Sequence, residues 1–111
     1  MNDCIFCKII AGSIPAERVY EDEHVVVFPD IYPKAPVHLL MIPREHVASL
    51  NDFTAAHDGL AAHLLRTLPK VAERAGLKDG YRTIINTGRG GGQEIFHVHV
   101  HILGGGSLPG F

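Results

Sequence analysis

The chain has 111 residues, of which 46% are hydrophobic and 20% charged, and its formal net charge is −2. A chain of this length suits one globular domain with a single core, so we expect one domain over residues 1–111. The slightly acidic balance argues against a nucleic-acid polymer as partner, because such proteins usually carry a strongly basic face. A single nucleotide, in contrast, needs only a local site.

The sequence also argues against a membrane partner. No apolar run approaches the roughly 20 residues needed to cross a bilayer, and the first residues, MNDCIFCKII, lack the organisation of a signal peptide. We therefore expect a cytoplasmic protein. Thiols stay reduced in that compartment, so Cys4 and Cys7 are not expected to form a structural disulfide.

The first half of the chain predicts a short helix and three strands. The helix runs from Asp3, its cap, to about Ala11, and Gly12 ends it. Residues 19–20 and 24–28 flank an acidic turn and indicate a hairpin. After a proline-rich loop, residues 37–42 (VHLLMI) predict the third strand.

The second half predicts a long helix and two further strands. Leucines at helical spacing mark the helix from about Thr54 to Ala75, and Pro69 is expected to kink or break it. Residues 81–86 (YRTIIN) predict the fourth strand, and a glycine-rich loop then leads into a histidine-rich strand that ends at residues 104–106. One main helix inserted among strands suggests an α+β fold with a mostly antiparallel sheet.

The histidine-rich strand reads HVHVHILGG, with imidazoles at His97, His99 and His101. Alternation of period 2 predicts that the three rings share one face of the strand. The residues that would face the core instead are Val98, Val100 and Ile102. A stripe of three titratable rings gains no stability, so we expect chemistry here. His-x-His can also bind a metal, but strand residues i and i+4 are roughly 13 Å apart, so separate roles for the three rings fit better.

A neutral imidazole is a competent nucleophile near pH 7, because its ordinary pKa is about 6.5. Attack on phosphorus would give a phospho-imidazole that water can open. Backbone N–H groups of the loop Gly88–Gln93 would bind the phosphate oxygens, and neighbouring imidazoles would serve the leaving group.

The pair Cys4-x-x-Cys7 has three interpretations. It could be a redox pair, although nothing around it resembles a thioredoxin-like context. It could chelate Zn²⁺, which requires two further ligands. It could also be two buried thiols without chemistry.

The motif HVHVHILGG resembles that of the histidine triad (HIT) family of nucleotidyl hydrolases and transferases. The likeness continues through CIFCKIIAGSIPAERVYEDE, FPDIYPKAPVHLLMIPREH, GYRTIINTG and GGQEIFHVHVHILGG, in the family's order. The segment with Asp30, Ile31 and His38 is similar to the Hint branch, the histidine triad nucleotide-binding proteins. This resemblance implies a HIT-like fold: an antiparallel five-stranded sheet with one long and one short helix. It further implies a homodimer formed through the long helix and a strand.

The resemblance also implies roles for the site residues. His99 would be the nucleophile that forms a nucleotidyl-histidine, with its other ring nitrogen held by a backbone carbonyl; His101 would bond a phosphate oxygen or the leaving group, and His38 would help to position the site. The other residues expected to bind the nucleotide are the apolar clamp around the base (Ile5, Phe6, Ile9, Phe28 and Ile31), Asp30 on the ribose, and Asn86, Gly92, Gln93 and Glu94 on the phosphate and leaving-group side.

Members that begin CIFCKII resemble zinc-bearing ones. The resemblance therefore implies a structural Zn²⁺ bound by Cys4, Cys7, His46 and His97, which would tie the first helix to the sheet. Catalysis itself would need no metal. The remaining histidines at 24, 57 and 63 show no partner pattern and are expected on the surface.

The implied activity is that of a purine nucleoside phosphoramidase, which cleaves the P–N bond of adenosine 5′-phosphoramidate to give AMP and an amine. A dinucleoside polyphosphate hydrolase and a non-catalytic nucleotide-binding protein are the alternatives. Two departures leave the leaving group open. Glu94 stands where better-known Hint proteins carry a small hydroxyl residue, and the tail GGGSLPGF lacks tryptophan.

Overall fold

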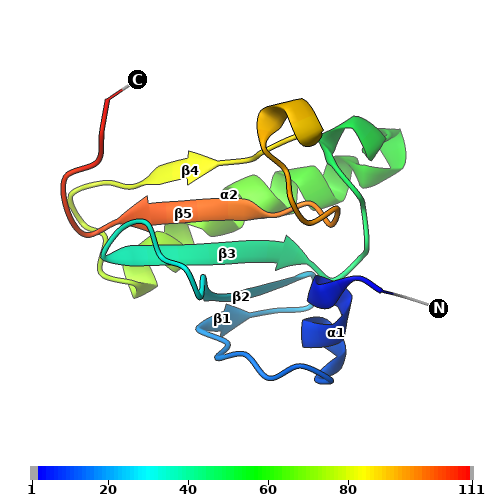
Figure 1. Cartoon of the computed structure of the whole chain (residues 1–111), viewed down its shortest axis with the longest axis horizontal. Coiled ribbons are helices and arrows are strands. Elements are labelled where there is room, and N and C mark those ends of the chain that lie inside the picture. The colour runs from blue at the N-terminus through cyan, green and yellow to red at the C-terminus, as the bar shows by residue number, and fades with distance from the viewer. Residues whose placement is uncertain (1–2, 111) are drawn as a thin grey trace.

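Within the part of the chain that the structure describes, five strands form one antiparallel sheet in the order β1-β2-β3-β5-β4 (Figure 1). The computed structural model describes residues 3–110. The elements are α1 (Ile5–Ala11), β1 (Tyr20–Glu21), β2 (Val25–Pro29), β3 (Val37–Pro43), α2 (Asp58–Arg74), β4 (Arg82–Ile84) and β5 (Val100–Gly104), with short 3₁₀ turns at Leu50–Asp52, Ala55–His57 and Arg89–Gly91. The expected α+β architecture, with one short and one long helix, is confirmed.

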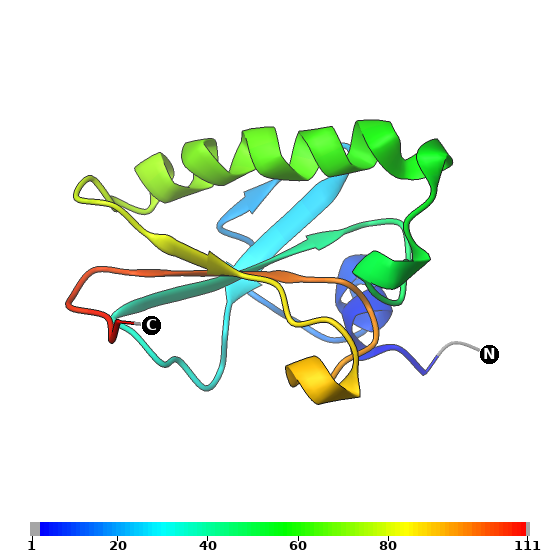
Figure 2. The same ribbon diagram turned by 90° about the horizontal axis from the view of Figure 1, so that it is seen from above.

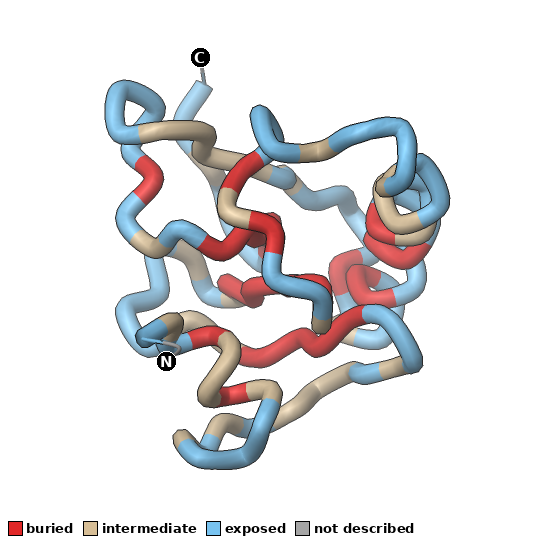
Figure 3. Tube along the Cα trace, turned by 90° about the vertical axis from the view of Figure 1, so that its right-hand side faces the viewer, coloured by how far each residue is buried: buried red, intermediate tan, exposed pale blue. Residues whose placement is uncertain are grey.

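Helix α2 covers one face of the sheet along its length (Figure 2). Alternate strand residues meet it in one apolar core, as the period-2 pattern of the strands predicts. The buried members of this core are Val25, Val27, Leu39, Met41, Leu64, Leu68, Val71, Ala72, Leu77, Val100 and Ile102. Buried segments accordingly run through the middle of the molecule, with exposed loops around them (Figure 3).

Helix α1 lies on the opposite face and covers only part of it (Figure 2). Phe6 and Ile9 pack there in a second, smaller cluster with Val26, Phe28, Leu40 and Ile42. Gly12 ends the helix with φ of +84°, a conformation that glycine adopts without strain. A seven-residue helix is too short to cover the whole face, so the rest of that face is open to other uses.

Three local expectations were wrong. The N-cap of α1 is Cys4 rather than Asp3, since the Cys7 N–H donates to Cys4 Sγ. Of the expected kink or break at Pro69, the break is wrong: α2 continues through Pro69, which lies on the exposed side of a helix whose other side is anchored in the core. Strand β5 begins only at Val100, so His97 and His99 precede it. Among the helices of residues 3–110, none has the length and apolar character to cross a membrane.

Candidate active site and metal cluster

A cavity of about 840 Å³ opens on the α1 face of the sheet. Helix α1 and the segment that follows it form one wall, and the loop after β2 and the segment between β4 and β5 also line the cavity. His38 on β3 and His101 on β5 form the floor with His99. The cavity is bounded mainly by apolar side chains, so polar groups are concentrated at a few points.

His99 is held in one orientation. Its side chain is buried, and its Nδ1 lies 2.8 Å from the backbone carbonyl oxygen of His97. A carbonyl only accepts, so the proton of the neutral ring sits on Nδ1 and Nε2 carries the lone pair. The edge-to-face contact with Phe6, at 5.2 Å between centroids, fixes the plane of the ring. This arrangement suits a nucleophilic nitrogen.

A chain of hydrogen bonds fixes the tautomers of the other two imidazoles. The Lys34 backbone N–H donates to His38 Nδ1 at 3.0 Å, so the proton of His38 lies on Nε2. His38 Nε2 in turn donates to His101 Nδ1 at 2.8 Å, which leaves the His101 proton on Nε2. His101 therefore offers an N–H to whatever binds beside His99.

Burial keeps these two rings neutral. It lowers the pKa of His38, although the nearby Asp30 carboxylate opposes the shift. Burial, together with the neighbouring His99 and His38, lowers the pKa of His101 to about 4. At neutral pH these two rings are thus uncharged, and the group that they offer to the cavity is the His101 Nε2–H.

The structure brings nearly all of the expected nucleotide-binding residues to this cavity. Those that line it are Ile5, Phe6, Ile9, Phe28, Asp30, Ile31, Asn86, Gly92, Glu94, His99 and His101. The exception is Gln93, whose buried side chain accepts from the Gly88 N–H and donates to two backbone carbonyls. Gln93 thus shapes the glycine loop, and direct contact with a nucleotide stays a prediction.

Other lining residues had no signal in the sequence. The segment after α1 contributes Ile14, Pro15, Ala16 and Glu17, and the loop after β2 adds Tyr32 and Lys34. Nothing in their spacing marks them, because they lie in loops. The role of Lys34 rests on its backbone N–H, which sequence patterns do not report.

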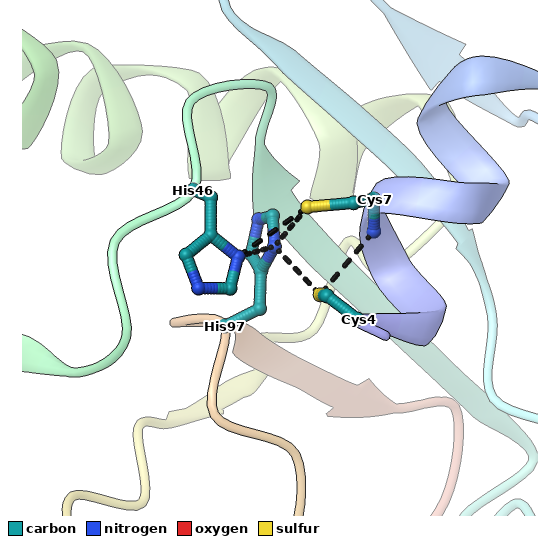
Figure 4. A group of neighbouring side chains, drawn as sticks. All are labelled: Cys4, Cys7, His46 and His97. Atoms are coloured by element: carbon teal, nitrogen blue, oxygen red, sulfur yellow. Dashed lines mark hydrogen bonds between the residues drawn. The ribbon is translucent and has the colours of Figure 1, made fainter. Parts of the chain in front are cut away.

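The side chains of Cys4, Cys7, His46 and His97, here called the metal cluster, converge from three segments (Figure 4). Their ligand atoms all lie within 4.8 Å of one another. The two Nδ1 atoms are 3.2 Å apart, and the sulfur–nitrogen distances shorter than 4 Å are 3.3, 3.3 and 3.6 Å. A tetrahedral zinc site with ordinary bond lengths needs about 3.3 Å and about 3.6 Å for these pairs.

The protonation of His97 also suits a ligand. Its Nε2 donates to the Pro43 carbonyl oxygen at 2.8 Å, which leaves the Nδ1 lone pair toward the metal cluster. Burial lowers the pKa of His97 and raises the pKa of the Cys4 thiol. A bound cation would favour the thiolate, so these four residues could hold a metal ion.

Of the remaining histidines, only His24 is an exposed surface residue as expected. His57 and His63 are partly buried and have carboxylate partners: His57 Nε2 lies 3.1 Å from Glu45, and His63 Nε2 lies 2.8 Å from Asp22. Both contacts tie α2 or its preceding turn to loops outside the cavity.

Comparison with known proteins matches nearly the whole chain. The family model described as scavenger mRNA decapping enzyme C-term binding matches residues 3–109. Protein HitA of Neisseria gonorrhoeae is 52% identical over 104 residues, covering 94% of this chain and 97% of that protein. The purine nucleoside phosphoramidase of Escherichia coli K12 is 45% identical over 108 residues, covering 96% of this chain and 91% of that enzyme. A solved structure of a HIT family hydrolase from Legionella pneumophila has a TM-score of 0.92 at 45% identity, with 96% of each chain covered.

Proposed function

Since this chain belongs to the histidine triad (HIT) family, whose fold is thereby confirmed, we propose that it is a hydrolase that cleaves the P–N bond of purine nucleoside 5′-phosphoramidates. The observation that carries the proposal is the His99 ring, held by the His97 carbonyl so that Nε2 presents its lone pair beside the His101 N–H. A nucleophile next to a neutral donor suits attack on a phosphate ester or amide.

The proposed reaction has two steps. His99 Nε2 attacks phosphorus, the P–N bond to the amine breaks, and the amine leaves after taking a proton from solvent. The His97 carbonyl stabilises the positive ring of the nucleotidyl-histidine through Nδ1–H. Water then attacks phosphorus, the bond to Nε2 breaks, one proton returns to solvent, and AMP is released. His101 Nε2–H binds a phosphate oxygen throughout.

The apolar part of the cavity is the proposed base site. Phe6 and Phe28 stand edge to face at 5.6 Å between centroids, and Ile9 is buried beside them. Asp30, at the edge of this region, would accept hydrogen bonds from the ribose hydroxyls; one of its oxygens already accepts from the Tyr32 N–H. Asn86 and Gly92 would border the phosphate.

The charges of the cavity favour the amide over the dinucleoside polyphosphate alternative. Three acidic residues, Glu17, Asp30 and Glu94, line it together with one lysine, Lys34. The low pKa values of His38 and His101 leave these rings uncharged. A polyphosphate leaving group would bring several further negative charges into this field, whereas an amine brings none.

We also propose that the metal cluster binds Zn²⁺ with a structural role and that the protein is a cytoplasmic homodimer. Two thiolates and two imidazoles are a ligand set that zinc prefers. For the dimer, β4 is an edge strand and Leu65 on α2 is 64% exposed, so both elements have surface to pair. Light scattering on the purified protein tests for twice the chain mass.

Turnover of adenosine 5′-phosphoramidate by wild type and His99→Ala tests the activity. We expect His99→Ala to lose at least about 10³-fold in kcat, because a covalent nucleophile is removed. His24→Ala, the same substitution at an exposed surface histidine, is the matched control and should keep full activity. Equal rates for wild type and His99→Ala would exclude the mechanism.

Two further outcomes separate the alternatives. Faster hydrolysis of diadenosine polyphosphate than of the phosphoramidate would favour the polyphosphate hydrolase. Binding of AMP without turnover of either compound would leave a non-catalytic nucleotide-binding protein.

A further inference from the structure

His97 takes part in both clusters through different atoms. Its Nδ1 belongs to the metal cluster, at 3.2 Å from His46 Nδ1. Its backbone carbonyl oxygen accepts the hydrogen bond that orients His99. A shift of His97 would therefore move the group that directs the His99 lone pair.

Sheet pairing does not fix the main chain at this point. The pairing of β5 with β3 begins at Val100, opposite Met41, three residues after His97. The segment before it is anchored by the Val98 N–H on the Val47 carbonyl, at 2.7 Å, and by the His97 side chain on the Pro43 carbonyl. A metal bound to His97 Nδ1 would therefore hold the main chain at a point that the β3–β5 pairing does not fix.

Helix α1 makes a second connection between the metal cluster and the cavity. It has seven residues, and helices this short are not stable alone in water. Cys4 and Cys7 belong to its cap and first turn, and Phe6 between them contacts the rings of both His97 and His99. The position of α1 thus sets both a cavity wall and the packing of His99.

Without a cation, the metal cluster has weak means to stay closed. His97 Nε2 is occupied as a donor, so its Nδ1 can only accept. Thiols are weak donors, and their contacts with Nδ1 are much weaker than metal–ligand bonds. Loss of the ion would remove the strongest link between His97 and the start of α1, leaving His97 held by the Pro43 carbonyl and α1 held by Phe6 and Ile9.

From this shared geometry we infer that metal loading of the cluster positions His99 and the α1 wall, so that nucleotide affinity depends on a metal that does not touch the nucleotide. The inference rests on the proposed function in taking the cavity as the nucleotide site. In this role His97 and Phe6 are positioning residues. The metal would then affect the affinity of the cavity for nucleotide as well as the stability of the fold.

Variants at His46 test this inference. His46 is an exposed ligand that does not line the cavity, so its replacement changes the metal site alone. His46→Ala removes a ligand, whereas His46→Cys offers a thiolate in its place. Each variant and wild type is measured with Zn²⁺ bound and after chelation. The readouts are the AMP dissociation constant by calorimetry, the His99 ring ¹⁵N shifts by NMR, and the folded fraction by circular dichroism.

We expect chelated wild type and His46→Ala to bind AMP about tenfold more weakly or worse, the size typical when a group that orients a binding residue is lost. Their His99 ring signals should show mixed tautomers, while most of the protein stays folded. His46→Cys with Zn²⁺ should restore both readouts. His24→Ala, the surface control, should match wild type.

An AMP affinity and a His99 tautomer that do not change on chelation would overturn the inference. So would a loss of binding no larger than the loss of folded protein, because the metal would then be only a structural tie. The His99 ring signal needs neither turnover nor nucleotide. A failure of the proposed activity with loaded wild type is therefore distinguishable from a failure here.

Discussion

Alternate residues of each strand point to opposite faces of the sheet, and the two faces differ in what covers them. On one face the 17-residue helix α2 packs against a continuous apolar core. On the other, the seven-residue helix α1 leaves part of the sheet uncovered, and His38 and His101 lie there beside a cavity. A helix too short to cover its face therefore leaves room for a site, while the fold is stabilised mainly from the other side.

Ile102→Ala should destabilise the core on the face that α2 covers. Ile102 is fully buried under α2, so the substitution removes apolar contacts and leaves a space in the core. We expect the free energy of unfolding to fall by about 2–5 kcal/mol. Urea denaturation measures it. At temperatures where the variant is folded, kcat should stay within a factor of about two, and a large loss of kcat would contradict the separation of the faces.

His101→Ala, one residue earlier, should do the reverse. The substitution removes the N–H donor beside His99 but leaves the α2 core untouched. We expect kcat for the phosphoramidate to fall by about 10²-fold, as when one oxyanion donor is lost. Steady-state kinetics and urea denaturation on the same samples give both values. Destabilisation as large as that of Ile102→Ala would show that His101 serves the fold.

Low pH should also lower the stability of the protein through His101, on the cavity face of the sheet. The folded pKa of His101 is about 4, below the value near 6.5 expected for the unfolded chain. Between these values only the unfolded state takes up the proton, so stability falls as pH drops from about 6.5 to 4, by up to about 3 kcal/mol. In His101→Gln the free energy of unfolding should change less with pH over this range, as measured by urea denaturation at several pH values. Equal slopes would contradict the assignment.

Asp22, on the turn before β2, titrates in a different range. Burial tends to raise its pKa, but hydrogen bonds from the His24 N–H, the His63 ring, the Val25 N–H and the Tyr20 hydroxyl together lower it to about 2. This carboxylate adds stability above about pH 4 that is lost as pH falls toward 2, about 1–2 kcal/mol. In Asp22→Asn, the free energy of unfolding should therefore lose the decrease that this carboxylate causes below about pH 4. The decrease between about pH 6.5 and 4 that we attribute to His101 should stay the same.

Pro69→Ala should produce the smallest effect. Pro69 lacks the N–H that would bond to the carbonyl of residue 65, but it lies on the exposed side of α2. Alanine restores the hydrogen bond, while the unfolded chain gains freedom, so we expect a net gain of about 1 kcal/mol. Thermal unfolding by circular dichroism checks it. A loss of stability would mean that α2 depends on the proline ring itself.

The same contrast explains what the sequence could predict. Period-2 alternation correctly assigned Val100 and Ile102 to the core, because only the apolar side of this strand can be buried under α2. It placed His97 on the strand wrongly, since its side chain is bound to the Pro43 carbonyl and turned to the metal cluster before the ladder starts. Motif spacing brought Cys4 and Cys7 together, but their partners from distant segments came only through the family resemblance.

Gln93 shows the other limit. The family resemblance implied that Gln93 contacts the nucleotide, yet its side chain bonds to Gly88, Ala48 and Ile95 of the protein itself. Which partner an amide chooses depends on where loops pass, and local sequence does not specify that. Asn86 likewise donates to the Gly91 carbonyl, although it also lines the cavity.

The hydrogen-bond chain that starts at the Lys34 N–H has a consequence for how this loop can evolve. The chain has one direction because a main-chain N–H cannot become an acceptor, and it ends with an N–H on His101. The His101 N–H that faces the cavity is thus set by the main chain of a surface loop. A change of side chain at position 34 keeps the backbone donor, whereas proline, which has no N–H, would remove the group that fixes the tautomers of the two rings.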